Sequence, residues 1–304
     1  MSKPYIAVIG AANIDLRGRS YAPLIPRDSN PGEISSAFGG VGRNVAHNLR
    51  LLDTNVQLLT AFGDDVWASE LKSDCIARGI GLDGAVTVLD MPTSSYLYIT
   101  GPDGDMALAV CNTDVAGEIT PQFLDARRAL LENAALVVFD GNLAEETIAH
   151  LCEICRVPLF ADPVSVTKAE RLKPFLRHIH TLKPNAIEAA HLTGEDDPEK
   201  AANALVALGV KRAFVSAGEN GIFAADQNGC KRIPCFPAEM KNATGSGDAA
   251  MAALCRAYLD GCDLEKCAMY AAAAGAITVA SEDTVSPALS RDAILHKIYK
   301  NGGK

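Results

Sequence analysis

The sequence lacks the lysine-bearing phosphate loop that many ATP-binding proteins use. No G-x-x-x-x-G-K motif occurs in its 304 residues, which excludes that mode of nucleotide binding. Long hydrophobic runs are also missing, because the longest apolar-rich stretch, residues 267–280, is too short to span a bilayer. The first residues show no signal-peptide pattern. We therefore expect a soluble, cytoplasmic protein without a membrane partner.

Basic residues are in the minority. The chain has 28 lysines and arginines against 37 aspartates and glutamates, a net charge of −9, which argues against binding to nucleic acid. Its nine cysteines, an odd number, fit a reducing compartment. The C-x-x-C at 152–155 has no second pair at zinc spacing, and the six histidines form no metal-ligand pattern. We expect these residues to be structural.

A hydrophobic content of 48% is enough for one large core, and we expect a single domain over residues 1–304. Residues 5–10 form an apolar, β-branched run that is typical of a buried parallel strand. From residue 119 onward, strands and helices alternate, which predicts an α/β fold with a doubly wound, mostly parallel sheet flanked by helices. The helices expected there include 121–131, 144–155 and 167–176, and the strands include 135–139, 158–161 and 180–182.

Two regions, about 15–38 and 85–112, interrupt this alternation with short strand-like pieces. Residues 16–38 have no helical period and contain three prolines, which predicts a loop plus an edge strand. The second region has strand-like runs separated by turn residues. Together they predict a small antiparallel sheet added to the main domain, with an exposed edge suited to a homodimer. The runs of the second region are 86–89, 94–100 and 106–111.

Residues 241–251 contain two glycines, a hydroxyl and a carboxylate directly before an apolar helical run. Gly245, Ser246 and Gly247 would present backbone N–H groups at the start of that helix, where an anion binds well. Asp248 would then lie where a carboxylate can take the proton from an attacking hydroxyl. For such a segment alone, a glycine turn followed by an ordinary helix-start aspartate is the commoner explanation.

A second glycine cluster, at residues 38–44, also opens an apolar-periodic helix. It shows a G-G-x-x-x-N pattern, and residues 242–248 read N-A-T-G-S-G-D. In this order the two segments resemble the signatures of the ribokinase-like (PfkB) family of carbohydrate and nucleoside kinases, over residues 5 to about 286. The resemblance implies ATP-dependent phosphoryl transfer, with Asp248 as the base and the small sheet as a lid over the sugar.

The resemblance also assigns substrate-binding residues. Asn13 and Asp15, just after the first strand, would hydrogen-bond sugar hydroxyls, and Arg43 reads as a solvated charge. Two glycines would let the backbone approach the sugar closely, and an asparagine in the first helical turn would face it. These three residues are Gly39, Gly40 and Asn44. The lid candidates, which could instead only build their strand, are Thr93, Ser94, Ser95 and Tyr96.

For the nucleotide, residues 183–188 match the family's K-P-N-x-x-E motif, which implies that Asn185 and Glu188 organise waters around a magnesium ion bridging the ATP phosphates. One carboxylate plus water is a usual style of magnesium binding. Without the resemblance, Glu188 reads as a helix-start acid, and residues 216–221 read as a hairpin turn. The ATP-binding candidates are Asn185, Ser216, Gly218, Gly221 and Thr244.

Asn242 departs from the family pattern, which usually has aspartate at this position beside a monovalent cation. An amide oxygen can still be a ligand, but the charge is gone, so potassium activation is doubtful.

Finer segments look like the pseudouridine kinase branch and predict phosphorylation of the ribose 5′-hydroxyl of pseudouridine. A ribokinase or an adenosine-type kinase is the alternative within the family. A non-catalytic sugar or nucleotide sensor is the alternative from another class. The segments are 28–32, 39–44, 93–96, 162–165 and 180–185, together with Asn242.

Overall fold

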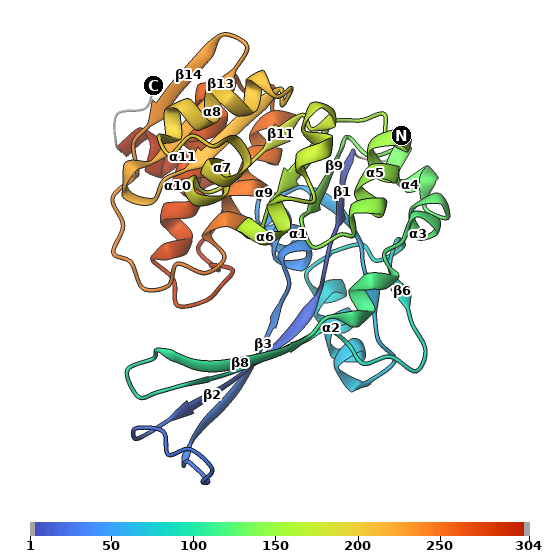
Figure 1. The fold of residues 1–304 in the computed structure, drawn as a ribbon, viewed down its shortest axis with the longest axis vertical. Helices are drawn as coiled ribbons and strands as arrows, with labels where there is room; N and C mark the ends of the chain where they lie inside the picture. Colours follow the sequence, from blue (N-terminus) through green and yellow to red (C-terminus); the bar gives the residue numbers. More distant parts are fainter. Residues whose placement is uncertain (1–3, 301–304) are drawn as a thin grey trace.

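An eight-stranded sheet forms the centre of this computed structural model, which describes residues 4–300 (Figure 1). The strand order is β14-β13-β12-β11-β10-β9-β1-β4, with parallel pairing from β4 to β12 and antiparallel pairing at β13 and β14. The strands are β1 Tyr5–Ile9, β4 Asn55–Leu59, β9 Leu136–Asp140, β10 Leu159–Asp162, β11 Thr181–Leu182, β12 Arg212–Ser216, β13 Ile222–Asp226 and β14 Gly229–Ile233.

Helices cover both faces of this sheet, so the doubly wound prediction is confirmed. Alternate residues of β1 enter two separate cores: Ile6 and Val8 pack with α1, α9, α10 and α11, whereas Ala7 and Ile9 pack with α5, α7 and α8. The helices are α1 Val41–Leu51, α2 Val66–Ala77, α3 Pro121–Asp125, α4 Arg128–Glu132, α5 Glu145–Ile154, α6 Val166–Ala169, α7 Ala186–Thr193, α8 Pro198–Ala207, α9 Ser246–Leu259, α10 Leu264–Val279 and α11 Arg291–Lys300. No helix within residues 4–300 combines the length and apolar character needed to cross a membrane.

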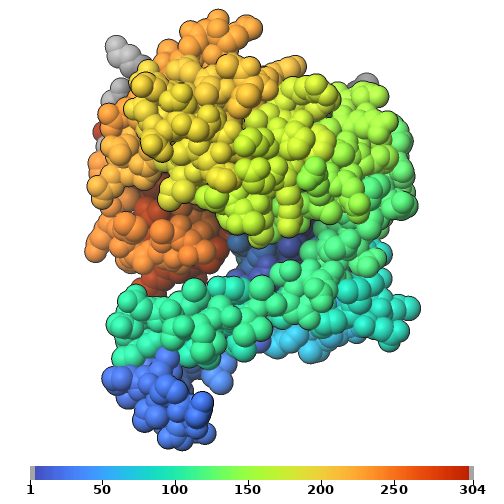
Figure 2. Space-filling view, viewed as in Figure 1, coloured from blue at the N-terminus to red at the C-terminus, as the bar shows by residue number. Residues whose placement is uncertain are grey.

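A four-stranded sheet of order β3-β2-β7-β8 projects from this body (Figure 1). We call it the lid sheet. Its outer pairings are antiparallel and its central β2–β7 pairing is parallel. In Figure 2 a hollow separates this sheet from the orange and red C-terminal part. The strands are β2 Asn13–Ser20, β3 Gly32–Gly39, β7 Ser95–Thr100 and β8 Met106–Asn112.

Several predicted boundaries are wrong. Residues 16–20, expected in a loop, belong to β2, where apolar or glycine residues alternate with charged ones. Residues 86–87 pair with β5 (Ala61–Phe62) as strand β6 (Val86–Thr87) outside the lid sheet. The helix expected over 121–131 is two short helices, α3 and α4. The helix expected over 167–176 ends early, and a 3-10 helix, Lys173–His178, follows, because Pro174 cannot continue an α-helix.

Candidate active site

The two glycine clusters meet where helices α1 and α9 begin. The helices pack against one another, and the Asn44 side-chain nitrogen donates to Asp248 Oδ2 at 3.0 Å. The two residues are 204 positions apart in the sequence. The fold therefore brings two distant segments into one site. They are residues 38–44, the sugar-side cluster, and residues 242–248, the phosphate-side cluster.

Both helix starts depend on glycine in a left-handed conformation. Gly40 has φ of 94° and Gly245 has φ of 81°, values that side chains disfavour. A Cβ atom at Gly40 would overlap the Ala11 carbonyl oxygen, and one at Gly245 would overlap the Thr284 carbonyl oxygen. The first amides of α9 have no acceptors within the helix, and the Ser246 N–H makes only a long contact of 3.4 Å with the Ala243 carbonyl oxygen.

Asp248 lies in the first turn of α9 and is partly buried. Burial raises its pKa to about 7, and the negative charge of Asp162 adds to this effect. The hydrogen bond from Asn44 and the positive charge of Lys183 act in the opposite direction. A carboxylate with a pKa near 7 suits a general base at neutral pH.

Two neighbouring strands of the central sheet each end in an aspartate. Asp140 ends β9, Asp162 ends β10, and the two are register partners. Burial raises the pKa of Asp140 to about 6, and one of its carboxylate oxygens is buried without a hydrogen-bond partner. Lys183 follows β11 and forms an ion pair with Asp162 at 2.9 Å. Neither aspartate nor Lys183 is among the site residues that the sequence predicted.

The predicted sugar-binding residues lie together at the base of the lid sheet. The Asn13 side-chain nitrogen donates to Asp15 Oδ1 at 2.5 Å. Gly39 is the register partner of Asn13, and a Cβ atom there would overlap the Asp15 carboxylate. Burial raises the pKa of Asp15 to about 6. The group offers an amide, a carboxylate and close backbone approach, which fits adjacent hydroxyls that need donors and acceptors.

Arg43 is not the solvated charge that we expected. Its side chain is only 5% exposed and pairs with Asp74 at 2.6 Å. It also donates to the Phe38 carbonyl oxygen at 2.9 Å and to Asn44 Oδ1 at 3.3 Å. The donation to the Asn44 oxygen turns the amide nitrogen of Asn44 toward Asp248. Nothing in the local sequence distinguishes a buried arginine from a solvated one, so the sequence could not reveal this role of Arg43.

The lid candidates divide into two groups. The hydroxyl of Thr93 donates to Asp65 Oδ1 at 2.6 Å and its backbone N–H donates to Asp65 Oδ2 at 2.8 Å, so Thr93 is held against the start of α2. Ser94 is equally buried. Ser95 and Tyr96 are half-buried on β7, and Tyr96 is the register partner of Asp15. Of the four, Tyr96 is therefore the one that neighbours the sugar-side residues across the sheet.

The predicted magnesium residues form a helix cap at the start of α7. Asn185 Oδ1 accepts from the Glu188 N–H at 2.8 Å, and Glu188 Oε2 accepts from the Asn185 N–H at 2.9 Å. Glu188 is buried, which raises its pKa. No group of three or more histidine, cysteine, aspartate or glutamate residues within residues 4–300 could hold a metal. One carboxylate fits magnesium only if waters and phosphate oxygens complete the ligand set.

The remaining nucleotide-side candidates flank this cap. Ser216 forms an isolated bridge with Asn185, and its hydroxyl donates to the Pro184 carbonyl oxygen at 3.3 Å. Gly218 and Gly221 both have positive φ in the turn that follows β12. The loop before α9 is held by Asn242.

Asn242 uses both ends of its amide within that loop. Its oxygen accepts from the Thr244 N–H at 2.9 Å, and its nitrogen donates to the Glu282 carbonyl oxygen at 2.9 Å. The amide therefore closes the loop that leads to Gly245.

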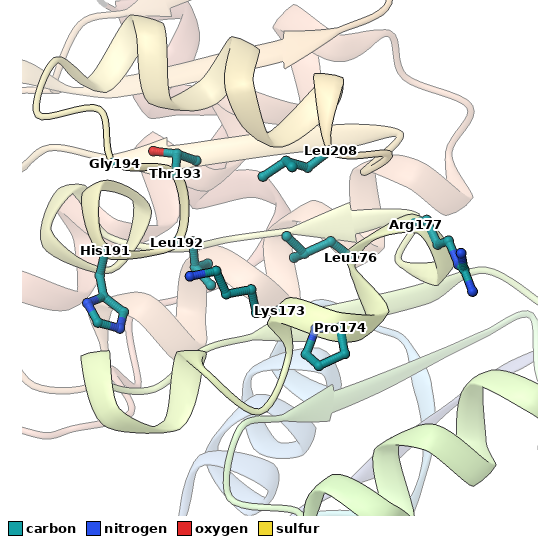
Figure 3. A pocket seen from close by; sticks show the side chains of 9 residues that line it. All are labelled: Lys173, Pro174, Leu176, Arg177, His191, Leu192, Thr193, Gly194 and Leu208. Atoms are coloured by element: carbon teal, nitrogen blue, oxygen red, sulfur yellow. The ribbon is translucent and has the colours of Figure 1, made fainter.

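An open groove lies at the other end of α7 (Figure 3). A helix of eight residues is about 12 Å long, so this groove is separated from the cap at Asn185 by the length of α7. None of the predicted site residues lines it. Its lining residues are Lys173, Pro174, Leu176, Arg177, His191, Leu192, Thr193, Gly194 and Leu208.

Comparison with known proteins gives a consistent answer. The model of the pfkB family carbohydrate kinases matches residues 3–291. Pseudouridine kinase of Escherichia coli (strain K12) is 35% identical over 295 residues, which cover 95% of this chain and 94% of that protein. A carbohydrate kinase from Agrobacterium tumefaciens has a solved structure that is 32% identical, with a TM-score of 0.88 over 98% of this chain and 97% of that one.

The solved structure of a ribokinase from Thermotoga maritima shares the fold, with a TM-score of 0.87 and 22% identity. The match covers 98% of this chain and 100% of that one. The ribokinase-like fold expected from the sequence is thereby confirmed. The match over nearly the whole chain also confirms the expected family. The chain belongs to the pfkB family of carbohydrate kinases, which transfer a phosphoryl group to an alcohol.

Proposed function

We propose that this protein is an ATP-dependent kinase that phosphorylates the ribose 5′-hydroxyl of pseudouridine. The observation that carries the proposal is the position of Asp248, in the first turn of α9 and hydrogen-bonded to Asn44 of the sugar-side cluster. One carboxylate can therefore reach a hydroxyl on the sugar side and a phosphoryl group at the helix start. The 35% identity to a pseudouridine kinase favours this nucleoside.

In this mechanism Asp248 accepts the proton of the attacking hydroxyl while the amides of Gly245, Ser246 and Gly247 stabilise negative charge on the transferring phosphoryl group. Phosphoryl transfer depends mainly on positioning and charge neutralisation. The ribose is held by Asn13, Asp15, Gly39, Gly40 and Asn44. Of the lid candidates, Tyr96 pairs with Asp15 and shares its face of the sheet, whereas Thr93 is held by Asp65 and Ser95 lies on the opposite face.

ATP lies along Asn185, Ser216, Gly218, Gly221 and Thr244 in this proposal. When bound, magnesium supplies positive charge to the phosphates, and Asn185 and Glu188 would hold it through water. Because Asn242 offers a neutral amide oxygen where the family usually has a carboxylate, we infer that potassium activates this protein little.

The test of the substrate is an ADP-release assay across pseudouridine, uridine, adenosine, ribose and fructose. We expect the highest kcat/KM with pseudouridine. A preference for free ribose would point to a ribokinase, and a preference for adenosine to an adenosine-type kinase. Binding without ADP release from any of them would point to a sensor, which the presence of Asp248 and both glycine turns disfavours.

We also infer that two copies associate through the lid sheet. Residues that are register partners share a face of a sheet, and one face of the lid sheet carries Ile34, Leu97, Leu108 and Val110, all exposed. Asp15 lies on the opposite face, which adjoins the site. An uncharged apolar face of this kind is suited to a second copy of itself.

A further inference from the structure

A buried lysine lies beneath the turn that begins α9. Lys183 is 6% exposed, and its ammonium group is 2.9 Å from Asp162 Oδ2. A Cβ atom built on Gly247 would lie 3.3 Å from the Lys183 nitrogen. The ammonium group therefore lies against the first turn of α9, whose amides receive the phosphoryl group in the proposed function. A buried ammonium group needs carboxylates around it. Asp162 forms the direct ion pair, and the charges of Asp248 and Glu188 also favour the charged lysine.

The charged groups that act on Asp248 come from several elements. Three charges affect its pKa through space. They belong to Asp140 at the end of β9, Asp162 at the end of β10, and Lys183 between β11 and α7. Asn44 of α1 adds a hydrogen bond. Lys183 is the cation in this group, and the two aspartates oppose it. Removing one member of the Lys183–Asp162 pair therefore changes the field at Asp248 in one direction, and removing the other changes it in the opposite direction.

We propose that Lys183 and Asp162 are a positioning pair that sets the protonation of Asp248 and thereby the pH range of phosphoryl transfer, an inference that rests on the proposed function. Neither residue needs to touch the substrate. Lys183 favours the ionised form of Asp248, which is the form that can accept a proton. Asp162 holds the lysine in place and favours the protonated form. The balance between them keeps the base available near neutral pH.

A structural role alone makes a different prediction. If the ion pair only stabilised the ends of β10 and β11, both single substitutions would lower stability or turnover without moving the pKa of Asp248. Replacing both members with neutral residues is often tolerated in a protein interior. The double substitution therefore separates a missing charge from a damaged fold.

The experiment compares Lys183→Met, Asp162→Asn and the double variant with the unchanged protein. Two quantities are measured: the pH at half-maximal kcat/KM for pseudouridine with ATP and magnesium, and the Asp248 titration of the ligand-free protein by infrared difference spectroscopy, with Asp248→Asn as the reference. We expect Lys183→Met to raise the midpoint by about one pH unit and Asp162→Asn to lower it by about one unit. The double variant should lie within about half a unit of the unchanged protein.

The matched control is Lys168→Met. Lys168 of α6 is another lysine near this end of the sheet, bonded to Asn142 at 2.5 Å. Its charge acts on Asp140, and it is not one of the main influences on the pKa of Asp248. Its removal should leave the midpoint unchanged. Midpoints that move in the same direction in both single variants, or that do not move, overturn the inference. If Asp248→Asn keeps full turnover, the proposed function itself is wrong, and the infrared titration still reports on the pair.

Discussion

At the scale of single residues, Asp248 is partly buried, yet it must be ionised to accept the proton of the attacking hydroxyl. Its raised pKa, about 7, means that the base becomes available as the pH rises through neutrality. We predict that kcat/KM increases about tenfold per pH unit below pH 6 and levels off above about pH 8. The measurement is a pH profile at fixed ionic strength. A profile that is flat between pH 5 and pH 8 would contradict this assignment.

The same burial should make Asp248 unfavourable for stability. A folded-state pKa above the ordinary value means that the folded chain holds the proton more tightly, so stability is lost as the pH rises from about 4 through about 7. Asn cannot ionise, so Asp248→Asn should raise the free energy of unfolding by on the order of 1 to 3 kcal/mol at pH 8. Urea unfolding at pH 8 and pH 4 checks this. The difference should disappear at pH 4, and a variant that is less stable at pH 8 would count against the burial argument.

At the scale of elements, the start of α9 depends on Gly245. Its φ of 81° is unfavourable for other residues, and an added Cβ would overlap the Thr284 carbonyl oxygen. We predict that Gly245→Ala costs at least about 2 kcal/mol of stability and abolishes turnover. Gly261→Ala is the control, because Gly261 has a similar φ of 73° but nothing within 4 Å of the added Cβ. Equal thermal shifts in the two variants would show that the overlap has no consequence.

Local chemistry explains which elements were predictable from the sequence. The β-branched run of β1 predicts a buried strand from a few neighbouring residues. Gly40 and Gly245 predict turns before helices in the same way. Strand β2 was missed although its residues alternate, because the prolines that follow it in residues 16–38 indicated a loop. The contact between Asn44 and Asp248 spans 204 positions, so only the family resemblance pointed to it. The Lys183–Asp162 pair and the burial of Arg43 have no local signature at all, since ion pairs depend on how strands are ordered.

At the scale of the whole molecule, the outer face of the lid sheet should join two copies. We predict that Ile34→Lys with Leu108→Lys raises the dimer dissociation constant at least about tenfold, since each substitution places a charge in an apolar interface. Sedimentation velocity over a range of protein concentrations measures this. Ile76→Lys is the control, because Ile76 is 65% exposed near the end of α2 and is not part of the apolar face of the lid sheet. An unchanged protein that sediments as a monomer at all concentrations would refute the dimer.

The central claim is that one carboxylate at the start of α9 accepts the proton of the hydroxyl that receives the phosphoryl group. The most direct measurement is the rate of ATP-dependent pseudouridine 5′-phosphate formation by the unchanged protein and by Asp248→Asn, with folding of the variant checked by the unfolding experiment above. We expect Asp248→Asn to lower kcat by about 10²- to 10⁴-fold. A variant that forms the product at the unchanged rate would contradict it.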